Sequence, residues 1–219
     1  MNEYFETLTP EQKEGIECVA KDMWKPYINA VMHHVPEAHT KIAFDKFHVA
    51  QHLGNAVNKV RLEEHKSLMT IGSGVLKGTK YDWLTNPDNM TDEKWDAFES
   101  LRYSNLKTAR AWSIKETAMS QWDYKSRAWT KKAWARWLSW AQRCRLEPMK
   151  KAAKTVKEHL WGIINAIVLK ADNGRSEGLN GKIQRLKGRA YGYRNRERFK
   201  TAIYFHCGGL ELYPVTAKR

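Results

Sequence analysis

Two short apolar runs with a helical pattern between them dominate the first fifty residues. The runs, residues 16–20 and 41–44, have the length of strands, whereas Tyr27, Val31 and Val35 between them recur at helical spacing. Strands joined by a helical crossover pair in parallel, and parallel strands are apolar because both of their faces are buried. The pattern therefore predicts a β-α-β unit.

A carboxylate follows each predicted strand. Asp22 comes two positions after the first run, and Asp45 comes directly after the second. Open α/β sheets bind their ligands at the carboxyl ends of parallel strands. We therefore expect both carboxylates at the edge of the sheet where a site would form.

Helix signals lie on both sides of this unit. Thr9 followed by a proline predicts a short helix that ends at Gly15, and residues 49–69 have the apolar spacing of an amphipathic helix. Residues 70–92 are rich in Gly, Asn, Asp and Thr, a composition that predicts loops and turns.

Residues 91–162 are predicted to form three or four packed helices, with breaks at residues 103–105 and at Pro148. Residues 163–169, which follow, fit either a strand or the end of a helix. Four tryptophans and one alanine in the block recur at helical separations of 7, 4, 4 and 3 positions, which predicts a core stripe, with a base-stacking platform as the alternative. The stripe consists of Trp122, Trp129, Ala133, Trp137 and Trp140.

The last section begins with a predicted turn at residues 171–175. Ser176 then has the character of an N-cap, with Glu177 in the first turn of a helix that Gly192 ends. A final helix is predicted over residues 196–206.

Composition narrows the class of protein. The 219 residues suffice for one domain with a sizeable core, or for one domain that carries an insertion, and ten of them are Trp. No apolar run approaches the roughly 18–20 residues that span a bilayer, so no membrane is expected. The three cysteines lack any C-x-x-C spacing and support neither a disulfide framework nor a thiolate zinc site.

The positive charge is concentrated in one segment. Residues 1–124 contain 15 Lys and Arg against 18 Asp and Glu, a net charge of −3, whereas residues 125–200 contain 21 against 5, a net charge of +16. Such a concentration predicts a polyanionic partner, with DNA or RNA first and an anionic membrane second. The alternative is a solvated charged face.

Glu177 and Asp22 meet only if the helical block between them is an insertion. Converging carboxylates bind Mg²⁺ or Mn²⁺, since hard cations prefer oxygen ligands, and paired ions support phosphodiester displacement. The alternative is structural, because a carboxylate after a strand often caps a helix and one in a first helical turn complements the helix dipole.

His48 and His52 are spaced i, i+4 and, with Asp45, form a candidate zinc site, the basis of an alternative zinc-dependent hydrolase. The other interpretation gives His48 a supporting role, in which it hydrogen-bonds near the acidic centre and orients it.

Several motifs together resemble the ISL-three group of bacterial insertion-sequence transposases. They are D-M-W-K-P-Y, V-P-E-A and F-D-K-F-H-V within residues 22–49, V-R-L-E-E-H-K at 60–66, L-K-G-T-K-Y at 76–81, N-G-R-S-E-G-L-N-G-K-I at 173–183 and R-A-Y-G-Y-R-N at 189–195. The resemblance implies a DDE-type, RNase H-like catalytic core with an all-helical insertion between the second Asp and the Glu. The fold class expected is thus α/β and mostly helical, a truncated RNase H-like core with a large all-α insertion.

By position, Asp22 resembles the family's second catalytic acid and Glu177 resembles its third. The resemblance implies that both side chains bind metal ions. Asp45 and His48 resemble the C/D-x-x-H signature that follows the second acid, although Asp45 as the second acid stays open. The family's first Asp, and its zinc-binding and helix-turn-helix regions, are expected to precede residue 1, so the chain resembles the C-terminal part of a transposase. The expected division is residues 1–69 for the core, 70–162 for the insertion and 163–219 for the C-terminal core helices.

Basic residues follow Glu177 along the chain. Three of them repeat at spacings of 3 and 4 on one helix, and with three more arginines they are expected to hold the DNA backbone. Asn180, one turn after Glu177, is expected to help position a phosphate or a ligand. The six basic residues are Lys182, Arg185, Arg189, Arg194, Arg196 and Arg198.

The function expected is metal-dependent cleavage and strand transfer of double-stranded DNA, at transposon ends and at the target, by a homo-oligomer in the bacterial cytoplasm. The alternative is a non-catalytic DNA-binding or dimerising transposase fragment.

Overall fold

The structure is a computed structural model that describes residues 2–171 and 174–209, without the side chains of residues 175–177. The chain divides into two compact units, residues 1–171 and 172–219, and each is described by itself. In the described part, no helix is long and apolar enough to span a membrane.

The first unit contains a two-stranded parallel sheet. Strand β1 (Val19–Lys21) pairs with β2 (Ile42–Phe44), with Val19 opposite Ile42 and Lys21 opposite Phe44. Helices α3 (Lys25–His34) and α4 (Ala38–Lys41) connect the strands, which confirms the predicted β-α-β unit. The first strand starts three positions later than predicted, whereas β2 is buried at every position.

Two short helices, α1 (Asn2–Glu6) and α2 (Pro10–Glu14), precede the sheet. The Thr9 hydroxyl accepts a hydrogen bond from the Gln12 amide, and the Gln12 side chain accepts one from the Thr9 amide. This capping box starts α2, and Gly15 ends it as predicted.

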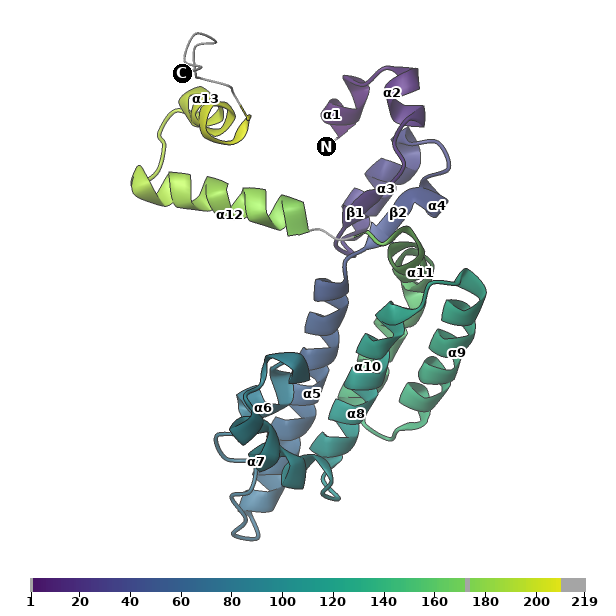
Figure 1. Ribbon diagram of the computed structural model, residues 1–219, viewed down its shortest axis with the longest axis vertical. Helices are drawn as coiled ribbons and strands as arrows, with labels where there is room; N and C mark the ends of the chain where they lie inside the picture. Colours follow the sequence, from purple (N-terminus) through teal and green to yellow (C-terminus); the bar gives the residue numbers. More distant parts are fainter. Residues whose placement is uncertain (1, 172–173, 210–219) are drawn as a thin grey trace, which may run out of the picture. The chain divides into compact units, whose positions relative to one another are not determined.

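Helix α5 (Lys46–Met69) is the central element of the bundle in Figure 1. Its 24 residues make it about 36 Å long. The helix starts three residues before the predicted amphipathic stretch because the Asp45 side chain caps its first turn. Its buried face carries Val49, Leu53, Ala56, Val57 and Val60.

The segment predicted as loops contains two short helical elements, α6 (Lys80–Leu84) and η1 (Pro87–Asn89). Helix α6 forms around the fully buried Trp83, whose indole donates a hydrogen bond of 3.1 Å to the Thr79 hydroxyl. Burial of one large side chain therefore overrides the local preference for turns.

The predicted helical block forms α7 (Asp92–Arg102), α8 (Lys107–Ser120), η2 (Gln121–Asp123), α9 (Arg127–Arg143), α10 (Glu147–Glu158) and α11 (Leu160–Leu169). The break at residues 103–105 is confirmed. The break at Pro148 is wrong, because α9 and α10 separate at residues 144–146 and Pro148 occupies the first turn of α10, where its missing amide costs nothing. Residues 163–169 are helical.

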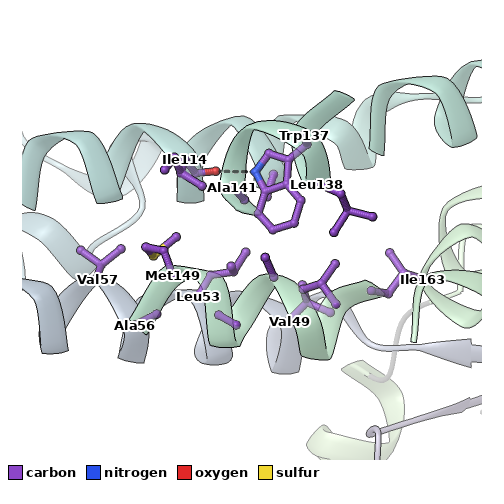
Figure 2. Packing of buried hydrophobic residues seen from close by; sticks show 14 of the residues in the cluster. Val49, Leu53, Ala56, Val57, Ile114, Trp137, Leu138, Ala141, Met149 and Ile163 are labelled. Atoms are coloured by element: carbon purple, nitrogen blue, oxygen red, sulfur yellow. Dashed lines mark hydrogen bonds between the residues drawn. The ribbon is translucent and has the colours of Figure 1, made fainter. Parts of the chain in front are cut away.

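The bundle core lies between α5, α8, α9 and α10, as Figure 2 shows around Leu53, Trp137 and Met149. The Trp137 indole donates a hydrogen bond of 2.8 Å to the Ile114 carbonyl. The predicted aromatic stripe is only partly right: Trp137 is buried and Trp122 half-buried, but Trp129 and Trp140 are exposed. The face of α9 that packs inward carries Thr130, Trp134, Trp137, Leu138 and Ala141.

The second unit contains α12 (Gly174–Arg189) and α13 (Arg196–Cys207). Helix α12 starts at Gly174, so the prediction of Ser176 as its N-cap is wrong. After α12, Gly192 has a φ of 97° and its amide donates to the Lys187 carbonyl, which closes the helix end as predicted. The Asn195 side chain accepts hydrogen bonds from two amides of α13 and caps that helix.

Candidate active site

The two predicted strand-end acids leave the sheet at matched positions. Asp22 and Asp45 directly follow the paired residues Lys21 and Phe44. The Asp45 amide donates a hydrogen bond of 3.1 Å to the Lys21 carbonyl, which extends the parallel ladder to the acids. Both backbones therefore reach the same carboxyl edge of the sheet, as the sequence predicted.

The two carboxylates differ in what they already bind. The Asp45 side chain is 7% exposed and accepts a hydrogen bond of 3.1 Å from the Phe47 amide, as the cap of α5. Asp22 is exposed and accepts only a long hydrogen bond of 3.4 Å from the Trp24 amide. Asp22 is therefore the acid with lone pairs available to a ligand, whereas Asp45 serves the helix.

A lysine that was not singled out from the sequence accompanies this edge. Lys21 is buried, its ammonium lies 3.8 Å from the centroid of the Tyr27 ring, and it donates to the Trp24 carbonyl at 3.4 Å. Burial lowers the pKa of Lys21 to about 8, and the charge of Asp22 opposes that shift. The pKa of Tyr27 is raised by burial and by Asp22. The sequence feature that could have pointed to Lys21 is its position directly before Asp22, at the end of the predicted strand.

The zinc alternative finds no support in the structure. His48 is half-buried with its ring edge against Phe47, and His52 is exposed. His39 stacks on Trp161 with centroids 4.4 Å apart, so it serves packing. Among the described residues, no group of three or more His, Cys, Asp or Glu side chains is arranged to hold a metal ion.

Glu177 lies in α12, in the second unit, and its side chain is outside the described part. Its pairing with Asp22 as a metal ligand stays a prediction. Asn180, one turn later, is exposed.

The second unit holds a basic groove between α12 and α13. Lys182, Arg185 and Arg189 of α12 line it together with Tyr193 and other residues, and its volume is about 500 Å³. The remaining predicted contacts, Arg194, Arg196 and Arg198, are exposed at the start of α13. The groove thus presents cations to solvent on a surface that suits a phosphate backbone.

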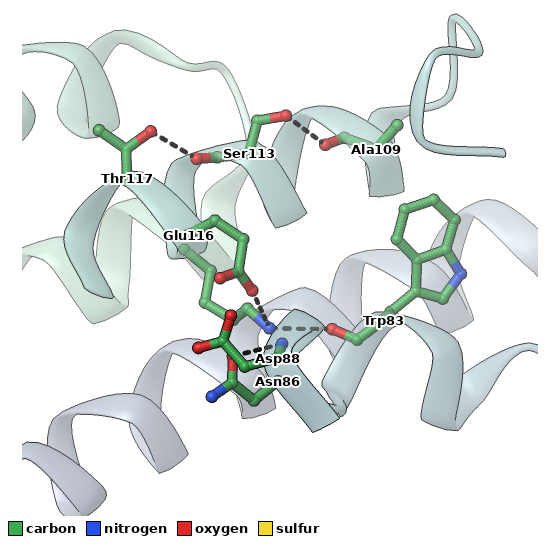
Figure 3. A network of polar contacts seen from close by, with 8 residues as sticks. Trp83, Asn86, Asp88, Ala109, Ser113, Glu116 and Thr117 are labelled. Atoms are coloured by element: carbon green, nitrogen blue, oxygen red, sulfur yellow. Dashed lines mark hydrogen bonds and ion pairs between the residues drawn. The ribbon is translucent and has the colours of Figure 1, made fainter. Parts of the chain in front are cut away.

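A second pocket, of about 460 Å³, lies in the bundle and was not found from the sequence. The Lys115 ammonium forms an ion pair of 2.6 Å with Glu116 and donates a hydrogen bond of 3.1 Å to the Trp83 carbonyl. Figure 3 labels Glu116, Trp83 and Asp88 in this polar network. Asp88 also lines the pocket. Lys115 and Glu116 are neighbours on α8, whereas Trp83 comes from α6 and Asp88 from η1, so no sequence spacing joins all four residues.

A comparison with known protein families identifies the class of this protein. A family model described as a transposase matches residues 1–203, and the chain belongs to the ISL3 family of DDE-type transposases, as its motifs predicted.

Individual relatives agree with the family. The chain is 28% identical over 199 residues, 90% of its own length and 48% of the relative's, to the "Transposase for insertion sequence element IS1001" of Bordetella parapertussis. It is 32% identical over 124 residues to the "Transposase for insertion sequence element IS1557" of Mycobacterium tuberculosis, across 55% of this chain and 27% of the relative. The chain thus spans about half the length of the first relative, and its match covers only 27% of the second. No solved structure matches it significantly.

Proposed function

We propose that this chain belongs to the catalytic core of a metal-dependent transposase, an RNase H-like core interrupted by an all-helical insertion that packs on α5. The supporting observation is the edge where Asp22 and Asp45 leave two parallel strands at matched register. The proposed division keeps residues 1–69 and 163–219 as core and residues 70–162 as insertion.

The proposed roles follow from the availability of each side chain. Asp22 and Glu177 would hold Mg²⁺ or Mn²⁺, which supply activation of an attacking oxygen and stabilisation of the leaving oxygen. Asp22 is favoured over Asp45 because the latter carboxylate is buried and caps α5. Asp45 would then cap α5, and His48, one turn later on the same helix, would orient the acidic edge of the sheet.

The proposed substrate is double-stranded DNA, at the transposon ends and at the target. The basic groove of α12 and α13 would hold its phosphates, which confers affinity without sequence preference. Cleavage followed by strand transfer is the chemistry that the family implies, and a homo-oligomer is the proposed assembly.

Calorimetric titration with Mn²⁺ tests the metal site. We expect binding by the unaltered chain, loss of binding in Asp22→Asn and in Glu177→Gln, and retention in Asp96→Asn, a control acid on α7. Equal heats from all four proteins would refute the pairing of Asp22 with Glu177.

A second candidate is DNA binding without catalysis, which the basic groove of α12 and α13 supports without any metal site. Under either candidate, removal of a groove cation should weaken duplex binding, as tested by Lys182→Ala, Arg185→Ala and Arg189→Ala. Each substitution should also reduce the slope of log affinity against log salt concentration by roughly 1. The matched control is Lys150→Ala, whose ammonium is already paired with Glu147. Metal-independent duplex binding without any cleavage would select this second candidate.

A further inference from the structure

One exposed face of α9 carries two tryptophans. Trp129 is 60% exposed and Trp140 is 39% exposed. Their separation of eleven positions is about three helical turns, so both indoles project from the same side of α9, about 16 Å apart along its axis. In Figure 1, α9 lies on the outside of the bundle.

These two side chains do not hold the bundle together. The inward face of α9, which includes the buried Trp134 and Trp137, supplies the packing. Leaving part of a large apolar side chain in water forgoes free energy that burial would supply. Two such side chains in line on one face indicate a surface that a partner covers.

Cations surround the indoles. Helix α9 contains five Lys and Arg residues and no Asp or Glu. The Lys132 ammonium lies 5.2 Å from the centroid of the Trp129 ring. Lys132, Arg136, Trp140 and Arg143 line a shallow hollow of about 710 Å³. Among the described residues, no ion pair engages any of the α9 cations.

The combination selects one kind of occupant. The unpaired positive charge favours an anionic partner, and the exposed indoles favour a partner with flat, exposed π-faces. A duplex conceals the faces of its bases in the stack, whereas a single strand exposes them. Successive stacked bases are about 3.4 Å apart, so about five base steps, or about six nucleotides, reach from one indole to the other.

We propose that the face of α9 formed by Trp129, Lys132, Arg136, Trp140 and Arg143 binds single-stranded DNA. The indoles stack on bases, and the cations contact the phosphates between them. The inference rests on the proposed function, in which cleavage of a transposon end frees a strand, and it assigns that strand a binding surface on the bundle.

Fluorescence anisotropy with a labelled twelve-nucleotide oligo(dT) tests the proposal on the full chain. The double variant Trp129→Ala, Trp140→Ala should bind the strand roughly ten-fold more weakly or worse. The corresponding double Phe variant should retain most of the affinity, because it keeps two aromatic rings. Tyr81→Ala, which removes a 70% exposed aromatic ring with a lysine 5.3 Å from its centroid on α6, is the matched control and should bind normally.

An abasic strand of equal length separates stacking from charge. The unaltered chain should prefer oligo(dT) to the abasic strand, and the double Ala variant should lose that preference. Equal affinity of the unaltered chain for both strands, or no change in the double Ala variant, would overturn the proposal. So would a double Ala variant that keeps its DNA affinity but loses self-association in sedimentation, since a second copy of the chain would then be the occupant.

A parallel titration with a duplex keeps the two proposals apart. Duplex binding together with single-strand binding that ignores the indoles refutes only the α9 surface. Failure to bind either form refutes the DNA function as well.

Discussion

Asn165 of α11 donates a hydrogen bond of 2.9 Å to the carbonyl of Ile42 in β2, across 123 positions of the chain. The same amide nitrogen donates to the His39 carbonyl at 2.8 Å, and the side-chain oxygen accepts from Arg127 at 3.0 Å. This buried amide thus joins the sheet, α11 and the start of α9.

Replacement of Asn165 by Ala should therefore destabilise the first unit. It leaves two backbone carbonyls and a guanidinium without their partner, at a cost of about 1–3 kcal/mol. Urea unfolding followed by circular dichroism measures the loss. Gln142→Ala, an exposed site on α9, is the control and should lie within about 0.5 kcal/mol of the unaltered chain. An unchanged midpoint for Asn165→Ala would contradict the role of the amide.

Gly162 of α11 lies against the Phe44 ring, where a larger residue would not fit. A Cβ at this position of α11 would overlap the Phe44 side chain, so Gly162→Ala should cost about 1–3 kcal/mol in the free energy of unfolding. At Gly54 of α5 a Cβ meets only Leu84, at an ordinary 3.5 Å, so Gly54→Ala should be neutral or gain up to about 1 kcal/mol. Phe44→Leu should relieve the Gly162→Ala penalty in the double variant; strictly additive effects would argue against the contact.

Glu64 supplies a helix cap from a distant part of the chain. Its carboxylate accepts three hydrogen bonds of 2.7 Å, from the amides of Lys107 and Thr108 and from the Thr108 hydroxyl, at the start of α8. Leu106, at the N-cap position, offers no side-chain cap. Glu64→Ala should therefore cost about 1–3 kcal/mol by urea unfolding. Glu63→Ala, at the exposed neighbouring position, should cost little, and equal losses at both sites would remove the special role of Glu64.

The pKa of Lys21 predicts how stability depends on pH. Burial lowers this pKa from 10.5 to about 8 in the folded chain, so between these pH values the unfolded chain binds more protons. Stability must then rise as the pH increases from about 8 towards 10, because deprotonation removes the cost of a buried ammonium.

Lys21→Met isolates this effect. The stability of the unaltered chain relative to the variant should increase from pH 8 to pH 10. Measurements stop at pH 10 because the raised pKa of Tyr27 acts in the opposite direction above that value. A difference between the two proteins that stays constant over this range would show that Lys21 titrates normally.

The sequence was sufficient where a local pattern determines the structure. The parallel unit with its two acids followed from apolar runs around a helical spacing, and α2 followed from Thr9 before a proline and from Gly15 at its end. The family motifs at residues 60–66 have a structural meaning that spacing did not reveal: they contain Glu64, the cap of α8, and the buried Arg61, which donates to the Leu76 carbonyl at 3.3 Å.

The sequence was insufficient where the partners of a residue lie elsewhere in the chain. From helical spacing alone, either Trp129 or Trp134 could lie on the buried face of α9. The packing of the neighbouring helices decides between them: Trp134 is buried and Trp129 is exposed. Asp45 and Asp22 follow their strands alike, yet the start of α5 buries one and leaves the other exposed. Pro148 marks a helix start as readily as a break.

The chain leaves β2 for the bundle at Asp45 and returns to β2 through Asn165. The bundle is therefore a closed loop with both ends anchored at one strand. The entropy of closing such a loop grows only with the logarithm of its length, and doubling it costs about 0.6 kcal/mol. The closure entropy therefore sets little limit on the length of the bundle, while Asp45 and Asn165 hold its two ends at the sheet.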